Sequence, residues 1–282
     1  MSKILITGSE GQLGKCFQAI AREFPEYELI FASKSNFDIT NLKSFKSFYN
    51  QKKFNGIINC AAYSNVTKAQ HDIKKSEELN GKGVKNLVEF TEKNKLFLIH
   101  FSTDYVFDGA KGQYSEEDAT NPINEYGRTK LEGEQYLAKN SNDSLIIRTN
   151  VLYDYASNSN ASFLNWIVHS LNDKKVINVV DDQINNPTWT MSLAIVIDRA
   201  IQTELNGFIH WGDADWISRY EFALKIAESF NLKKDLIEPI KTAELKQTAI
   251  RPLKGGLSTI YAEKILNLEP PKIEHCLHQL KK

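Results

Sequence analysis

The stretch Lys3-Ile4-Leu5-Ile6-Thr7-Gly8-Ser9-Glu10-Gly11-Gln12-Leu13-Gly14 opens the chain and determines the fold that we expect. An apolar run of strand length leads into three glycines, and a helical pattern begins directly after them. Glycines at such a turn let the backbone approach a pyrophosphate, and the free N–H groups at the helix start attract its negative charge. We therefore expect a dinucleotide to lie against Gly8, Gly11, Gln12, Leu13 and Gly14.

The spacing of these glycines is a variant of the dinucleotide-binding fingerprint, because two residues instead of one separate the first pair. The alternative is a tight strand-to-helix turn that holds no ligand. The position between a predicted strand and a predicted helix favours nucleotide binding.

The alternation of apolar runs and helical patterns continues through the first half of the chain. Strands are expected at residues 3–7, 28–33, 56–59, 97–102 and 145–149, and helices at 12–23, 41–51, about 73–94 and 126–139. Alternating elements of this kind predict a parallel sheet with helices on both faces. The strands are apolar throughout, as expected when both faces are covered. The predicted fold is α/β, a Rossmann-type doubly wound parallel sheet.

After about residue 150 the pattern loosens. Helices are expected at 158–171 and 218–230, with Ser218 as an N-cap, and short strands at 176–179 and 208–211. We divide the chain into a dinucleotide-binding domain, 1–150, and a smaller, mainly substrate-binding C-terminal lobe, 151–282. The boundary is soft, because the chain can cross back into the sheet.

The composition excludes several classes of function. Lys+Arg and Asp+Glu are 35 each in 282 residues, so no global positive charge directs the chain to nucleic acid or to a membrane surface. Three scattered cysteines predict a reducing compartment, with neither a disulfide framework nor a zinc site. No signal peptide is recognisable, and no apolar run approaches the roughly 18 residues that span a bilayer. We expect a cytoplasmic enzyme without a metal.

Thr103, Tyr126 and Lys130 form the expected chemical centre. Reduction of a ketone by hydride requires a proton at the oxygen, and a tyrosine can donate one when a nearby ammonium lowers its pKa. Tyr126 and Lys130 lie four residues apart and share a helix face, and Thr103 ends a strand where α/β sheets bind ligands. The alternative is a surface Tyr/Lys pair with a capping threonine. Tyr49 and Lys53 form a second such pair, which we interpret as structural.

The segment after the second strand selects the cofactor. Ser33-Lys34-Ser35 offers a cation for a 2′-phosphate, and no acidic residue precedes Asp38. We therefore expect NADP(H), with NAD(H) as the alternative. Ala61, Ala62 and Tyr63 follow the third strand, where small residues allow the backbone to lie against the cofactor or permit close packing. His100, His169 and His210 lie in apolar surroundings and are interpreted as core residues, and no catalytic triad is recognisable.

These residues resemble the extended short-chain dehydrogenases/reductases and, more narrowly, the dTDP-4-dehydrorhamnose reductase family. The most specific match is Ser102-Thr103-Asp104-Tyr105-Val106-Phe107. Further matching segments follow through almost the whole chain in family order: residues 6–14, 37–40, 59–63, 124–134, 148–149, 182–183, 187–188 and 251–252.

The resemblance implies NADPH-dependent reduction of the 4-keto group of a nucleotide-linked 6-deoxyhexose, most closely dTDP-4-dehydrorhamnose to dTDP-L-rhamnose, in deoxysugar and polysaccharide biosynthesis. Tyr126 would be the acid, Lys130 would hold the nicotinamide ribose and Thr103 would bind the carbonyl. The remaining implied contacts are Asp38 and Ile39 near the adenine, Asp104 and Val106 in the sugar pocket, and Asp182, Gln183 and Arg251 on the substrate side. Arg251 also suits bidentate contact with a diphosphate, although a surface salt bridge is the alternative.

The chain departs from the family pattern at several substrate contacts. It has Thr67 and Gln70 where an acidic pair is usual, Val151 where an aromatic residue is common near the base, and Gly255 in place of a serine. A related epimerase/reductase, which would need a further Cys/His pair, and a non-catalytic NADP-binding regulatory subunit stay open as alternatives. A homodimer is the assembly to test.

Overall fold

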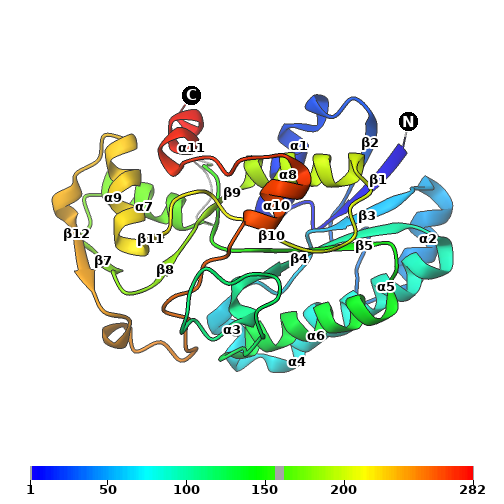
Figure 1. The fold of residues 1–282 in the computed structure, drawn as a ribbon, viewed down its shortest axis with the longest axis horizontal. Coiled ribbons are helices and arrows are strands. Elements are labelled where there is room, and N and C mark those ends of the chain that lie inside the picture. Colours follow the sequence, from blue (N-terminus) through cyan, green and yellow to red (C-terminus); the bar gives the residue numbers. More distant parts are fainter. Residues whose placement is uncertain (1, 156–161, 282) are drawn as a thin grey trace.

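A six-stranded parallel sheet forms the centre of the computed structural model, which describes residues 2–155 and 162–281 (Figure 1). The strand order is β10-β5-β4-β3-β1-β2. The strands are β1 (Ser2–Thr7), β2 (Tyr27–Ala32), β3 (Gly56–Asn59), β4 (Phe97–Thr103), β5 (Ser144–Thr149) and β10 (Gly207–His210). The order reverses at β1, between β2 and β3, and ligands of such sheets bind at the carboxyl ends of the strands beside a reversal of this kind.

Helices cover both faces of this sheet. Ile4 and Ile6 point into one core layer with α1 (Gln12–Ala19) and α8 (Thr190–Gln202), while Leu5 points into the other. That second layer is completed by α2 (Leu42–Lys52), α5 (Gly83–Asn94) and α6 (Glu125–Asn140). Adjacent side chains of β1 are thus buried on opposite faces, which explains the uninterrupted apolar run. The doubly wound α/β fold expected from the sequence is confirmed.

The elements of the first half agree with the expected ranges to within a few residues. The strand at 56–59 has the expected bounds, and the helix at 12–23 ends as α1 at Ala19, with a 3₁₀ turn at Ala21–Glu23. The segment around 73–94 is helical but is divided into α4 (Ile73–Ser76), a π-helical stretch η2 (Glu77–Lys82) and α5. A short helix α3 (Val66–His71) precedes it.

The second half builds a smaller layer of its own. Its core lies between α7 (Phe163–Asn172), α9 (Arg219–Ser229) and α11 (Ile273–Leu280), beside the parallel pair β7 (Ile177–Val180) and β12 (Ile237–Ile240). Ser218 and Glu221 form a capping box at the start of α9, as the predicted N-cap requires. Part of the helix expected at 158–171 lies outside the described residues.

The same half also returns to the main sheet. β10 pairs in parallel with β5, and α8 packs on α1, so residues beyond 150 complete the first core. Two further short strand pairs lie in this half: β6 (Leu152–Tyr153) with β9 (Thr188–Trp189), and β8 (Ile184–Asn185) with β11 (Ile217–Ser218). The remaining helix α10 (Ile260–Leu266) lies over the first layer beside α8 (Figure 1).

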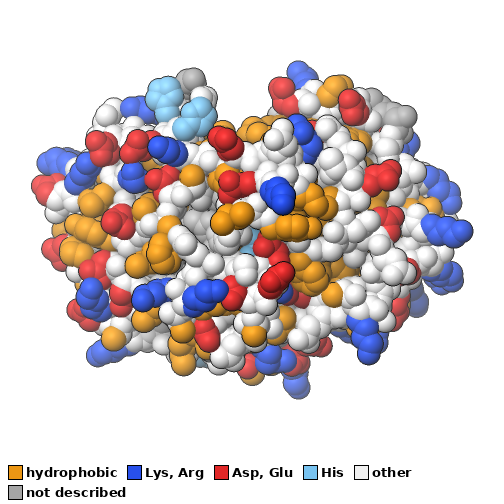
Figure 2. All heavy atoms as spheres, viewed as in Figure 1, with side chains coloured by type: hydrophobic (Ala, Val, Ile, Leu, Met, Phe, Trp, Pro, Cys, Tyr) orange, Lys and Arg blue, Asp and Glu red, His pale blue; other side chains and the backbone are white. Residues whose placement is uncertain are grey.

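Acidic and basic side chains are interspersed on the face shown in Figure 2. Over the described ranges, no helix is both long and apolar enough to cross a bilayer. No group of three or more His, Cys, Asp or Glu side chains in those ranges could hold a metal ion.

Candidate active site

The glycine turn packs backbone against backbone at the carboxyl ends of β1 and β3. Gly8 has φ +60°, a conformation that favours glycine, and a Cβ there would lie 2.7 Å from the Ala61 nitrogen. A Cβ at Gly14 would lie 2.6 Å from the Gly8 oxygen. The predicted cofactor residues Gly8, Gly14 and Ala61 therefore meet at one point of the sheet edge.

The start of α1 offers unused hydrogen-bond donors beside this turn. Within the described residues no side chain caps α1, and the Nε2 of Gln12 is buried without a hydrogen-bond partner. A helix start with free N–H groups and an uncapped positive dipole is suited to a phosphate. The turn thus fits the pyrophosphate of a dinucleotide.

The predicted cofactor residues in the segment after β2 differ in their exposure to solvent. Lys34 is exposed and follows the end of the strand. The Asp38 carboxylate accepts hydrogen bonds from the Thr40 N–H (2.9 Å) and hydroxyl (2.8 Å). The Ile39 side chain is buried in the core, so only its backbone could face a cofactor.

Asn80 is a buried residue that the sequence analysis missed. Its Oδ1 accepts from the Tyr63 N–H (2.9 Å), and its Nδ2 donates to the Tyr63 carbonyl (3.1 Å) and to Thr129 Oγ1 (3.1 Å). Asn80 lies in the wide π-helical turn η2, which packs closely on α6. A Cβ at Gly133 of α6 would lie 2.4 Å from the backbone carbonyl oxygen of Asn80. A polar residue next to Gly81 and before Gly83 in a buried helix was the available signal.

Thr103 and Tyr126 lie near each other, and the Thr103 hydroxyl favours the ionised form of the phenol. Thr103 ends β4, and Tyr126 lies in the first turn of α6, which begins after the N-cap Asn124. Gly127 permits this approach, since a Cβ there would lie 2.0 Å from the Tyr105 carbonyl oxygen. Burial raises the pKa of Tyr126 above its ordinary value, although the nearby Thr103 hydroxyl opposes this shift. Tyr126 therefore holds its proton firmly until a reaction draws it away.

Lys130 is buried one turn further along α6. Its Nζ donates to the Phe101 carbonyl (2.5 Å) and lies 3.3 Å from His100 Nε2. Burial lowers the pKa of Lys130 to about 8. His100 is buried as expected, but it also takes part in a polar network, because its Nδ1 lies 3.0 Å from Asn59 Nδ2. Lys130 thus forms its hydrogen bonds with two residues of β4, His100 and Phe101.

A cavity of about 410 Å³ lies on the side of the smaller lobe. Two guanidinium groups line it, those of Arg219 and Arg251. Arg251 Nη1 donates to the Tyr105 hydroxyl (3.3 Å), and the Tyr105 ring meets Tyr126 edge-on with centroids 5.8 Å apart. The other lining residues are Phe163, Trp166, Asn178, Val179, Val180, Gln183, Leu245 and Gln247.

The two arginines have no carboxylate within ion-pair distance in the described part of the chain. Burial lowers the pKa of Arg219, and the positive charge of Arg251 acts in the same direction. Arg251 is held instead by neutral groups, Gln247 Oε1 at 2.5 Å and Thr67 Oγ1 at 3.5 Å. Two unpaired cations beside an open cavity are suited to an anionic ligand. Arg219 was missed from the sequence, where it is only the first residue of a helix.

The other predicted substrate residues lie in different places. Gln183 lines the cavity, while Asp182 accepts from the Thr242 N–H (3.0 Å) and hydroxyl (2.6 Å) and so anchors the segment that carries Leu245. Asp104 is buried directly behind Thr103. The side chain of Val106 does not reach the cavity, because it is fully buried in a small core cluster with Phe107.

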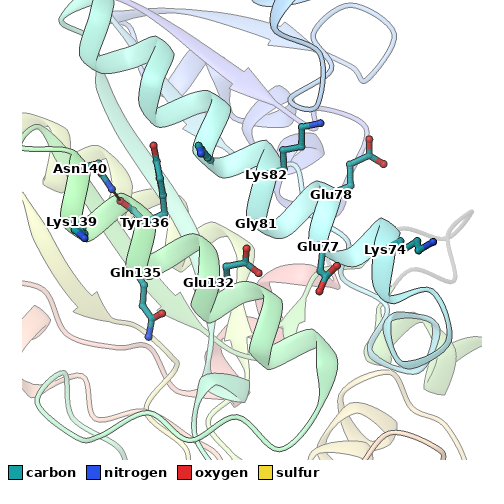
Figure 3. Close-up of a pocket in the computed structure, with 11 residues that line it drawn as sticks. Lys74, Glu77, Glu78, Gly81, Lys82, Glu132, Gln135, Tyr136, Lys139 and Asn140 are labelled. Atoms are coloured by element: carbon teal, nitrogen blue, oxygen red, sulfur yellow. Dashed lines mark hydrogen bonds between the residues drawn. The ribbon is translucent and has the colours of Figure 1, made fainter.

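A larger cavity, of about 950 Å³, lies away from all these residues, between the η2–α5 helices and α6 (Figure 3). Its wall carries both acidic and basic side chains, such as Glu77, Lys82 and Glu132, and it is open to solvent. Arg128 lies close by and bonds Glu77 at 2.6 Å. None of the predicted site residues lines it, and we assign it no ligand.

The chain is similar to known proteins over its whole length. A family model described as "RmlD substrate binding domain" matches residues 2–282. The dTDP-4-dehydrorhamnose reductase of Aggregatibacter actinomycetemcomitans is 31% identical, with 100% of this chain and 99% of that protein covered. The crystal structure of dTDP-4-dehydrorhamnose reductase from Bacillus anthracis in complex with NADP matches with a TM-score of 0.93 and 31% identity, over 100% of this chain and 99% of that one. Methionine adenosyltransferase 2 subunit beta of Bos taurus is 29% identical, over 84% of this chain and 75% of that protein.

Proposed function

The chain belongs to the RmlD substrate binding domain family, and we propose from this membership and the site geometry that it is an NADPH-dependent oxidoreductase that reduces dTDP-4-dehydrorhamnose to dTDP-L-rhamnose. The family resemblance noted in the sequence is confirmed. The single observation that carries the proposal is full-length similarity to reductases together with an intact Thr103, Tyr126 and Lys130 at the carboxyl end of β4. The reaction supplies a deoxysugar for polysaccharide biosynthesis.

NADP fits the glycine turn of this chain. The N–H groups at the start of α1 and the free Nε2 of Gln12 would hold the pyrophosphate, and Lys34 would face the 2′-phosphate. The Tyr63 backbone, clamped by Asn80, would form the neighbouring wall. The reduced cofactor supplies the hydride when it is bound.

Tyr126 donates the proton in this proposal. The carbonyl oxygen gains negative charge as hydride arrives, and the phenol O–H is the nearest strong donor. Because burial raises the pKa of Tyr126, the phenol is fully protonated before the reaction. Lys130 stabilises the phenolate that remains and holds the nicotinamide ribose, provided that its amine is protonated.

The cavity of about 410 Å³ is the proposed site of the sugar nucleotide. Arg219 and Arg251 would bind the diphosphate, since both line the cavity and, among the described residues, neither lies within ion-pair distance of a carboxylate. Phe163 and Trp166, whose rings lie 5.6 Å apart, offer an aromatic surface for the base. This pair stands in for the aromatic residue that the family commonly has where this chain has Val151.

A substrate panel tests the proposal. NADPH consumption would be followed with 4-keto-6-deoxy sugars linked to dTDP, GDP, CDP and UDP, with NADH as the parallel reductant. We expect the dTDP sugar with NADPH to give the highest kcat/KM. Binding of NADP(H) without oxidation on any member would support a regulatory subunit instead; the bovine relative is named as a subunit of methionine adenosyltransferase 2.

We further propose that the protein works in the cytoplasm and as a homodimer. Sugar nucleotides and NADPH are both available in that compartment, which supports the first part. Multi-angle light scattering of the purified chain tests the second, because a monomeric mass near 32.1 kDa would exclude the dimer.

A further inference from the structure

The Thr103 hydroxyl has no hydrogen left for a substrate in this structure. A hydroxyl can donate one hydrogen bond and accept two. Thr103 Oγ1 accepts from the Tyr105 N–H at 3.2 Å and donates to Asp104 Oδ1 at 3.2 Å. The Thr103 hydrogen is therefore directed inward, toward Asp104, and away from the site of the carbonyl.

Asp104 is the group that holds this arrangement in place. Its side chain is 2% exposed, and its Oδ2 has no hydrogen bond of ordinary geometry. Gly255 leaves space beside that oxygen, since a Cβ at this position would lie 2.5 Å from Oδ2. A serine there, as is usual in the family, would require Oδ2 to shift and would bring a hydroxyl beside it. The chain thus keeps one oxygen of a buried carboxyl group unpaired.

The charges around Asp104 do not outweigh its burial. Arg219 of α9 attracts the carboxylate, and the N–H groups of Asp104 and Gly256 also favour the charged form. Tyr126 is kept in its neutral form because burial raises its pKa, and Arg251 is a further positive charge that acts on Arg219. Burial nevertheless raises the pKa of Asp104 to about 6.

We propose that Asp104 is a positioning residue whose protonation turns the Thr103 hydroxyl hydrogen toward the substrate carbonyl. As a carboxylic acid, Asp104 donates to Thr103 Oγ1, which then accepts from Asp104 and from the Tyr105 N–H. The hydrogen of Thr103 is thereby released. As a carboxylate, Asp104 again accepts the hydrogen bond from Thr103. This inference rests on the proposed reductase function.

No proton leaves Asp104 during the reaction. The hydride adds to the carbonyl carbon, the C=O π electrons move to oxygen, and Tyr126 gives its proton to that oxygen. Asp104 only sets the direction in which the Thr103 hydroxyl donates. A diphosphate bound at Arg219 would offset the positive charge that stabilises the carboxylate, so the acid form persists to higher pH in the substrate complex.

The pH dependence of wild type and Asp104→Asn tests the proposal. The amide is neutral at every pH, and its Nδ2 can donate to Thr103 as the acid does. Wild-type kcat/KM should fall by about tenfold per pH unit above pH 6, whereas the variant should change by less than about threefold between pH 5.5 and 7.5. The kcat limb of wild type should lie at higher pH than the kcat/KM limb. A variant with the wild-type limb would overturn the proposal.

Gly255→Ser provides an independent variant. Its hydroxyl, placed beside Oδ2, would stabilise the carboxylate and move the limb to lower pH, and an unmoved limb counts against the proposal. A ¹³C NMR titration of the free protein, with the Asp104 signal assigned by its loss in Asp104→Asn, requires no turnover. A midpoint near 6 that falls in Gly255→Ser supports the inference, and a midpoint near 4 in wild type overturns it. Absence of turnover on every sugar nucleotide would instead refute the proposed function, while the titration still judges Asp104.

Discussion

The cofactor side and the substrate side of this molecule are built in different ways. On the cofactor side, backbone lies against backbone: Gly8 lies against the segment after β3, and Gly14 lies against Gly8, so closely that a Cβ at either glycine would collide. On the substrate side, the cavity is formed by side chains from distant segments, including Arg219 and Arg251. Backbone geometry requires particular residues at particular spacings and is therefore visible as a motif. A side-chain cavity tolerates substitution, and this chain has changed several of its contacts.

The largest expected effect lies where the two sides meet, at Tyr126. We predict that Tyr126→Phe lowers kcat by about 10²–10⁴-fold, because the proton donor is lost, and leaves NADPH affinity unchanged. Turnover assays and cofactor titration measure both. Tyr49→Phe is the matched control, since Tyr49 packs edge-on against Phe54 and Phe90 and should turn over at the wild-type rate. Activity close to wild type in Tyr126→Phe would exclude the acid role.

The substrate side should respond through KM alone. We predict that Arg251→Ala and Arg219→Ala each raise the KM for the sugar nucleotide by roughly 10- to 150-fold, which corresponds to a charge-assisted hydrogen bond of about 1.5–3 kcal/mol. NADPH affinity should not change. Lys225→Ala, which removes an exposed pair with Glu274 at 2.7 Å, is the control. A KM that stays at the wild-type value in both arginine variants, at equal stability, would place the substrate elsewhere.

The cofactor side should respond through cofactor preference. We predict that Lys34→Asp weakens NADPH binding by about tenfold or more and spares NADH, because the cation for the 2′-phosphate becomes a repelling anion. Fluorescence titration with both nucleotides gives the ratio. The neighbouring exposed residue Asn36, changed to Asp, controls for added negative charge. Equal loss of both nucleotides would contradict the assignment of Lys34.

The smallest predicted effect is a loss of kcat at high pH, caused by Lys130, which serves both the cofactor and the substrate side. Burial lowers the pKa of Lys130 to about 8, so its ammonium form, which the mechanism requires, is lost as pH rises through that value. In Asp104→Asn, which lacks the limb proposed for Asp104, we predict that kcat falls above pH 8, two units below the range of an ordinary lysine. Adding Lys130→Met should abolish this limb, slow turnover and weaken cofactor binding. A profile of Asp104→Asn that stays flat to pH 10 would show that Lys130 does not titrate there.

The fold could be predicted where burial and turn chemistry act together. The strands of the first half are apolar on both faces, as Ile4 and Leu5 illustrate, and glycines mark the first turn. Helix α8 was missed because its sequence is apolar with few polar interruptions and no side chain caps its start at Trp189. Its burial between α1 and the sheet explains that composition, but only tertiary structure reveals the partner.

The candidate site could be predicted only in part. The positions of Thr103 and Tyr126 follow from strand and helix ends, whereas Arg219 and Asn80 become candidates only through their neighbours in space. The hydrogen-bond partners of the Lys130 side chain could not be predicted from the sequence either. Sharing a helix face with Tyr126 does not reveal that a carbonyl of β4 takes its first hydrogen bond. Long-range hydrogen bonds of this kind leave no local pattern.

The most direct test of the central claim is isotope transfer in a single turnover. The protein would be mixed with dTDP-4-dehydrorhamnose and NADPH that carries deuterium at the transferred position, and the product would be analysed by mass spectrometry and NMR. Our account predicts dTDP-rhamnose with one deuterium at C4, and at least about 100-fold less product in Tyr126→Phe over the same time. Bound NADPH that is not oxidised, or a product without deuterium at C4, would contradict it.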